Sequence, residues 1–232
     1  MIFREDREES PPVRAFGAAL RHDGPVPERN RVTPGGEIVA IDQRGLFMGN
    51  RGCLHRDRRI VRPWQVRRWI TCVLEYKGWV APKWEPGRWT PLFFWDEAVA
   101  LAAGHRPCAL CRWANFNAWL DAWQSAFGER PRVDPMDRGL HADRVDGKLQ
   151  RRHVRAWSSL PAGAFAVLDW RRGGTASPVL VLEDRLVPWS PAGYGPPVER
   201  PVRGVATVLT PRATVEVLSH GYRPVIHPGR VG

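Results

Sequence analysis

The segment TPLFFWDEAVALAAGHRPCALCRW, residues 90–113, carries most of the information about the fold of this chain. Its apolar and aromatic start, LFFW at 92–95, is typical of a short buried strand. Asp96 then stands where a helix N-cap is expected, and the Ala-rich run after it is a strong helix former that stops at Gly104. The segment therefore predicts a strand, a short helix and a turn that carries a pair of cysteines.

Similar patterns extend the prediction on both sides of this segment. Folded structure is expected to begin at EIVAI, residues 37–41, and WITCVLEY, residues 69–76, is rich in the β-branched and aromatic residues of a buried strand. A longer helix is expected over 113–127 and a short third one over 133–145. Apolar residues recur at helical spacing along the longer helix, which predicts one buried face; they are Trp113, Phe116, Leu120, Trp123 and Phe127.

The second half of the chain has a different character. From about residue 150, short β-type runs alternate with Gly and Pro turns, and TPRATVEVLSHG at 210–221 ends the pattern as a helix. The fold class expected is α+β, with a zinc-knuckle module over 37–148 followed by a small antiparallel, barrel-like β-rich domain with a C-terminal helix over 149–232. Residues 1–36 are charged and rich in Pro and Gly, and they are expected to form a disordered arm.

Composition limits the class of partner. The 232 residues carry a formal net charge of +11, and the isoelectric point is near 10.6, which favours a polyanionic partner such as DNA. Only Lys77, Lys83 and Lys148 are lysines, so part of this charge can reflect the Arg-rich coding of a GC-rich genome. No run of 18 apolar residues is present, and the acidic start MIFREDREESPP does not read as a signal peptide. We expect a cytoplasmic protein without a membrane segment.

The four cysteines point to metal chemistry. Disulfides are rare in the cytoplasm, and a Cys-x-x-Cys turn can direct two thiolates at one tetrahedral zinc ion. Cys108 and Cys111 form this pair, and Cys72 on the predicted strand is expected to be a third ligand. Candidates for the fourth ligand are, in order, Cys53, His55 and His105. A redox pair and chemically inert buried cysteines are the alternative interpretations.

Residues 69–113 resemble the metal-binding domain of the Ada DNA-repair protein family. The likeness is sharpest over 92–112, where a strand, an Ala-rich helix, a Gly-x-Arg-Pro-Cys turn and a Cys-x-x-Cys pair follow one another. The resemblance implies a zinc ion held by cysteines and a place near DNA, with Cys108 and Cys111 as the downstream pair and Cys72 as one upstream cysteine. The chain lacks the closely spaced upstream pair from which that family draws its methyl acceptor.

The chain as a whole also resembles a set of uncharacterised bacterial proteins that share three sequence blocks. These blocks are GNRG at 49–52, HRPC at 105–108 and LTPRATV at 209–215. This second resemblance implies no activity.

Arginines flank each cysteine-bearing segment. If a metal gathers these segments, the arginines are expected to converge on one surface that contacts DNA phosphates; they are Arg51, Arg67, Arg68, Arg106 and Arg112. The alternative is that these arginines form an ordinary solvated face. Trp113, beside the pair, is expected to be a core residue.

A second set of residues is a candidate for catalysis. Asp137 and His141 are four residues apart on the predicted third helix, so the carboxylate could orient the imidazole as a general base. His55 is another candidate base. The simpler interpretation of the pair is a surface hydrogen bond.

The sequence therefore predicts a zinc protein that binds or processes DNA, in repair or in sensing modified DNA. An enzyme with a structural zinc ion and a histidine base, acting on a nucleic acid or a small molecule, is the first alternative. A non-enzymatic interaction protein is the second.

Overall fold

A mixed six-stranded sheet forms one side of the molecule in the computed structural model, which describes residues 26–169 and 176–228. In spatial order its strands are β10 (Arg106–Pro107), β6 (Ile70–Cys72), β3 (Phe47–Asn50), β9 (Leu92–Phe94), β1 (Arg29–Val32) and β2 (Ile38–Ala40). The β1–β9 and β10–β6 pairs are parallel, and the other pairs of this sheet are antiparallel.

The first strand of this sheet corrects the sequence prediction. Residues 29–36 were expected in a disordered arm, whereas β1 pairs on both sides, with β2 and with β9. The local sequence RNRV has little apolar content, but Val32 is 1% exposed in the core. Pairing with two strands satisfies the backbone hydrogen bonds that a composition argument does not see. Residues 1–25 of the predicted arm lie outside the described residues.

The expected strand over residues 69–76 is two strands. The chain leaves the sheet after Cys72 and forms a hairpin of β7 (Glu75–Tyr76) and β8 (Trp79–Val80). Lys77 and Gly78 in its turn both have positive φ, which is the geometry of a tight two-residue hairpin turn. A second small hairpin joins β4 (His55–Arg56) and β5 (Arg59–Ile60).

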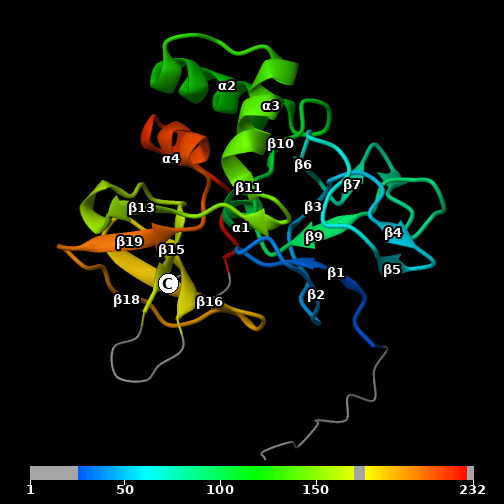
Figure 1. The fold of residues 1–232 in the computed structure, drawn as a ribbon, viewed down its shortest axis with the longest axis horizontal. Coiled ribbons are helices and arrows are strands. Elements are labelled where there is room, and N and C mark those ends of the chain that lie inside the picture. The colour runs from blue at the N-terminus through cyan, green and yellow to red at the C-terminus, as the bar shows by residue number, and fades with distance from the viewer. Residues whose placement is uncertain (1–25, 170–175, 229–232) are drawn as a thin grey trace, which may run out of the picture.

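The helices are found where the sequence predicted them. Asp96 caps α1 (Glu97–Ala102), since its Oδ1 accepts a hydrogen bond of 2.9 Å from the Val99 N–H. The three longer helices gather at one end of the molecule (Figure 1). These are α2 (Trp113–Phe127), α3 (Val133–Arg144) and α4 (Arg212–Ser219). In the described residues, no helix is both long enough and apolar enough to cross a membrane.

The second half forms an antiparallel sheet of seven strands, which confirms the α+β class and the β-rich second half. Its main order is β13 (His153–Ala156), β19 (Val205–Val208), β14 (Phe165–Leu168), β15 (Ser177–Val181), β16 (Arg185–Ser190) and β17 (Gly193–Tyr194). Strand β18 (Val198–Glu199) also pairs with β16. The expected closure into a barrel is not found: in the described residues, β13 and β17 stand at opposite ends of the strand order, so the sheet is open. The short hairpin of β11 (Val145–Asp146) and β12 (Leu149–Gln150) follows α3, and a 3₁₀ turn covers Trp157–Ser159.

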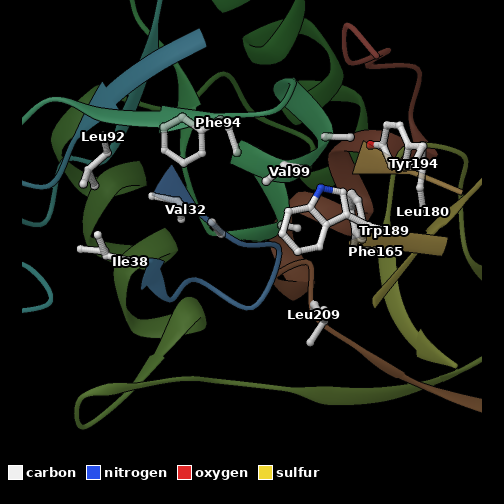
Figure 2. Packing of buried hydrophobic residues seen from close by; sticks show 14 of the residues in the cluster. Val32, Ile38, Leu92, Phe94, Val99, Phe165, Leu180, Trp189, Tyr194 and Leu209 are labelled. Carbon is white, nitrogen blue, oxygen red and sulfur yellow. The ribbon is translucent and has the colours of Figure 1, made fainter. Parts of the chain in front are cut away.

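One hydrophobic core joins the two sheets. Helix α1 has no exposed residue, and its Ala, Val and Leu side chains contact neighbours all round, as expected of a helix that is apolar on every side. Figure 2 shows Val99 of α1 between Phe94 of the first sheet and Phe165 of the second. A second cluster lies among α2, α3 and α4, around the fully buried Trp119.

Candidate metal centre

Strand pairing brings three cysteines together. Cys72 ends β6, and the parallel pairing of β10 with β6 sets Pro107 opposite Thr71. The Cys108 N–H continues this pairing with a hydrogen bond of 2.9 Å to the Thr71 carbonyl, and Cys111 follows in the turn before α2. The Sγ atoms of Cys72, Cys108 and Cys111 all lie within 4.8 Å of one another.

This arrangement has the size of a thiolate metal site. Tetrahedral zinc, with Zn–S bonds of about 2.3 Å, holds its sulfurs about 3.8 Å apart. All three cysteines are free thiols. Cys72 and Cys108 are buried, and Met48 and Ala81 pack around them. The site is therefore a compact set of soft ligands in apolar surroundings.

Hydrogen bonds make the three thiols unequal. The thiols of Cys111 and Cys72 donate to the Cys108 sulfur, which lowers the pKa of Cys108. The Leu110 N–H, 3.4 Å from the same sulfur, acts in the same direction. The pKa of Cys72 is raised, chiefly by its hydrogen bond to Cys108 and then by that to Cys111 and by burial. A thiolate is the form that binds metal, so Cys108 is the thiol best prepared to bind first.

The structure does not bring Cys53 to this cluster. In the antiparallel β3–β6 pair, Met48 lies opposite Cys72 and Asn50 opposite Ile70, so the chain beyond Asn50 moves away from Cys72. The Cys53 sulfur instead lies 3.8 Å from the His55 carbonyl oxygen. The ranking of Cys53 as the leading fourth ligand is corrected by this register, which the spacing of cysteines does not reveal.

The two alternative histidines are also engaged elsewhere. His55 is hydrogen-bonded through Nδ1 to the Thr90 hydroxyl at 2.7 Å and through Nε2 to the Glu85 carbonyl at 3.2 Å. His105 is 1% exposed and accepts a hydrogen bond of 3.3 Å from the Arg51 Nε. Within the described part of the chain, the close group of possible metal donors consists of the three cysteines alone.

Three of the five arginines predicted to contact DNA are buried. Arg106 makes two hydrogen bonds to Asp137, of 2.8 and 2.7 Å, and Arg112 pairs with Glu97 at 2.8 Å. Arg51 is 2% exposed. The prediction that these three form part of an exposed surface for DNA phosphates is wrong, because their side chains are buried.

The other two arginines, Arg67 and Arg68, are exposed, as predicted. Arg68 lines a surface cavity of about 570 Å³ that Cys108 and Arg132 also border. It pairs with Asp134 at 2.8 Å across the outside of α3. One edge of the thiol cluster is therefore next to a basic part of the surface.

The Asp137–His141 pair does not form the expected dyad. Asp137 forms an ion pair with Arg106, whereas His141 Nδ1 lies 3.2 Å from Arg144 Nη2. Both residues are buried rather than at the surface. Burial, with Arg144 beside the ring, lowers the pKa of His141 to about 4. The guanidinium of Arg106 binds the carboxylate more strongly than a neutral imidazole would, so helix spacing alone did not predict the partners.

The fold and site together define an α+β protein with a three-thiol cluster. Comparison with protein-family models, with curated proteins and with solved structures found no match.

Proposed function

We propose that Cys72, Cys108 and Cys111 hold a zinc ion. The observation that carries the proposal is the convergence of three free thiols from two distant segments to within 4.8 Å. Three thiolates form a soft ligand set that suits zinc. The N–H···S hydrogen bond from Leu110 supports a charged Cys108 sulfur at the turn.

The proposed centre has a place for a further ligand. Zinc takes four ligands in a tetrahedron, and three cysteines supply three of them. Cys108 borders the surface cavity described above. A water molecule or a group of a substrate can therefore complete the coordination from that side, which is how catalytic zinc sites differ from closed structural ones.

We further propose that the centre serves in binding or processing DNA. Three features support this role: the net charge of +11, the resemblance of residues 69–113 to the Ada metal-binding domain, and basic side chains around the cavity at Cys108. Arg67, Arg68 and Arg132 replace the three buried arginines as the proposed phosphate contacts. The histidine-base alternative is less favoured, because His141 and His55 are both held by other partners.

The zinc proposal is tested by metal analysis of protein purified without added metal. We expect one zinc per chain, loss of zinc in Cys108→Ser and full retention in Cys53→Ser, because Cys108 belongs to the cluster and Cys53 does not. Titration of native thiols should find the half-buried Cys53 reactive and the other three protected by the metal. A metal-free wild type with four titratable thiols would contradict the proposal.

The DNA proposal is tested by fluorescence anisotropy with a labelled duplex at several salt concentrations. We expect binding that weakens as salt rises. The slope of the logarithm of the binding constant against the logarithm of the salt concentration should be smaller in the Arg67→Ala, Arg68→Ala double variant. We expect it to fall by about one unit for each phosphate that the variant no longer binds. Arg203→Ala, an exposed arginine in the loop before β19, is the matched control. A zinc-loaded wild type that does not bind DNA would favour the non-enzymatic interaction protein instead.

A further inference from the structure

A second cavity, of about 740 Å³, lies away from the thiols. It is bordered by the β1–β2 turn, by residues 60–64 from the end of β5 onwards, and by the β11–β12 hairpin. Trp69, which precedes β6, lines it, whereas Cys72 stands at the other end of the same strand. The cavity has the size of a typical small-molecule site.

Two arginines that line this cavity are buried without a counter-ion. Arg51 is 2% exposed and Arg144 is 1% exposed, and their guanidinium groups stack on Trp69 at 4.2 and 4.1 Å. Arg51 donates to the Gly36 carbonyl and to His105. Arg144 donates to the carbonyls of Gly104 and Arg67 and lies 3.2 Å from His141 Nδ1. All of these partners are uncharged. Within the described residues, neither guanidinium has a carboxylate oxygen within 4.0 Å.

The other buried arginines of the molecule provide the comparison. Arg106 and Arg112 are as deeply buried, and each is paired with a carboxylate, Asp137 or Glu97. Arg51 and Arg144 each keep a buried N–H nitrogen without a hydrogen-bond partner, Nη2 and Nε respectively. Arg112 also keeps such a nitrogen, Nη1, but its charge is paired with Glu97, whereas Arg51 and Arg144 have no carboxylate partner. Polar groups of this kind are seldom left unpaired in a folded protein unless something else binds them.

The missing negative charge has an energetic consequence. Burial lowers the pKa of Arg51 to about 9, and burial followed by the nearby Arg51 lowers that of Arg144. Two buried cations that share contact with one tryptophan ring are costly, because each has lost water and neither is paired with an anion. An anion between or beside them would stabilise both.

The backbone at Gly104 leaves room for the side chain of Arg144. Gly104 has a φ of +85°, and a Cβ there would lie 2.5 Å from the Cδ of Arg144. The glycine therefore leaves the space through which the Arg144 side chain reaches the Gly104 carbonyl, 2.7 Å away. The arrangement depends on this one position and is not a loose surface contact.

The rim of the cavity adds positive charge and apolar surface. Arg62, Lys148 and Arg152 are exposed along it. Of the two acidic residues of the lining, Asp146 lies 3.9 Å from Arg151. Glu37 accepts a hydrogen bond from the Thr33 hydroxyl and makes no ion pair with Arg51, although its charge raises the pKa of Arg51 against the larger effect of burial. Trp64, Val61 and Leu149 are among the apolar residues of the lining.

We propose that this cavity binds an organic phosphate, with the phosphoryl group at Arg51 and Arg144 and an apolar or aromatic portion against Trp64. Guanidinium groups donate hydrogen bonds to phosphate oxygens and remain charged when buried. Each of the two has one N–H nitrogen without a partner in the protein, Arg51 Nη2 and Arg144 Nε. The volume exceeds what inorganic phosphate alone would fill. The site does not depend on the metal centre. The same phosphoryl chemistry can come from a free nucleotide or from the end of a DNA strand.

The test is isothermal titration of the full-length protein with three probes: inorganic phosphate, a nucleoside monophosphate and a short 5′-phosphorylated single strand. We expect the nucleoside monophosphate to bind at least about tenfold more tightly than inorganic phosphate, because its base, which inorganic phosphate lacks, can also contact Trp64. Preference for the nucleotide would identify a free small molecule as the source, and preference for the phosphorylated strand would identify DNA. No binding of any probe at millimolar concentration would overturn the proposal.

Variants locate the site. Arg62→Ala with Arg152→Ala removes two exposed rim charges and should weaken binding about tenfold or more, whereas Arg203→Ala should leave it unchanged. Arg51→Met should abolish binding with zinc content and circular dichroism unchanged; if this variant does not fold, the rim variants decide alone. Equal affinity in the wild type and the rim variant would place the phosphate elsewhere and overturn the proposal. Because zinc content is measured separately, failure here is distinguishable from failure of the metal centre.

Discussion

At the scale of single residues, two buried ion pairs hold the segment around the cysteine turn. Arg106 of β10 and Asp137 of α3 lie on segments 31 residues apart and make a bidentate pair with side chains 2% and 5% exposed. Arg112 and Glu97 form a comparable pair between the start of α2 and the start of α1. Both arginines flank the cysteine turn, so the pairs fix the segment that carries Cys108 and Cys111.

Removal of one partner of such a pair should be strongly destabilising. We expect Asp137→Ala to lower the free energy of unfolding by about 3–5 kcal/mol, because it leaves the Arg106 charge buried and unpaired. Urea unfolding followed by circular dichroism measures this value. Asp134→Ala on the same helix is the control, since Asp134 is exposed and pairs only with the exposed Arg68; it should change stability by about 0.5 kcal/mol or less. Equal losses in the two variants would contradict the buried-pair argument.

At the scale of secondary-structure elements, α2 shows where helical periodicity succeeds and where it does not. The pattern correctly predicts a helix with one buried face, and Phe116 and Leu120 lie on that face. Trp113 was expected in the core but is 61% exposed, and Phe127 is 44% exposed. Both residues stand at the ends of α2. Trp119, outside the predicted stripe, is the fully buried residue of the helix, against Tyr222 after α4.

The two tryptophans of α2 should respond very differently to truncation. Trp119→Ala is expected to cost about 3–5 kcal/mol of unfolding free energy, because it opens a large cavity among α2, α3 and α4. Trp113→Ala should cost about 0.5 kcal/mol or less, as its side chain is mostly in solvent. Thermal and urea unfolding of both variants give the comparison. A large loss in Trp113→Ala would mean that this ring is covered in solution.

At the scale of the whole molecule, the hydrophobic core does not follow the predicted division at residue 148. The largest cluster combines Val32 and Phe94 from the first half with Phe165 and Trp189 from the second (Figure 2). The β11–β12 hairpin also spans the division, since Asp146 pairs with Leu149. Contacts across the boundary therefore bind the two halves to one another.

Histidines spread through the molecule should make the fold sensitive to acid. The pKa values of His105, His141 and His153 are all lowered, in each case chiefly by burial. In the unfolded chain a histidine binds its proton near pH 6.5, whereas His141 in the fold does so only near pH 4. The unfolded state thus binds more protons between these values, so stability is fully present above about pH 6.5 and falls as the pH is lowered towards 4.

The measurement is the urea midpoint at pH 7.5, 6 and 5 for the wild type and for His141→Gln. We expect the wild type to lose stability steadily over this range and the variant to lose less, because a glutamine takes up no proton. The comparison separates the histidine contribution from protonation of the cysteine thiolates, which both proteins share. Identical pH profiles for the two proteins would exclude His141 as a contributor.

The sequence by itself determined those features that depend on neighbours along the chain. The Asp96 cap, the α1 helix, the α2 and α3 spans and the β-rich second half all follow from local periodicity and turn chemistry, and the Cys108–Cys111 turn follows from its spacing. Cys72 was correctly grouped with that pair. These predictions hold because a helix, a cap or a tight turn is stabilised mainly within a few residues.

Only the tertiary structure decided which distant residues meet. The β3–β6 register carries Cys53 away from the thiols, and Asp137 binds Arg106 rather than His141. Arg51 and Arg144, about ninety residues apart, come to share Trp69. Strand register and the choice of partner for a buried charge depend on what the rest of the core brings within reach, and the order of residues along the chain does not contain that information.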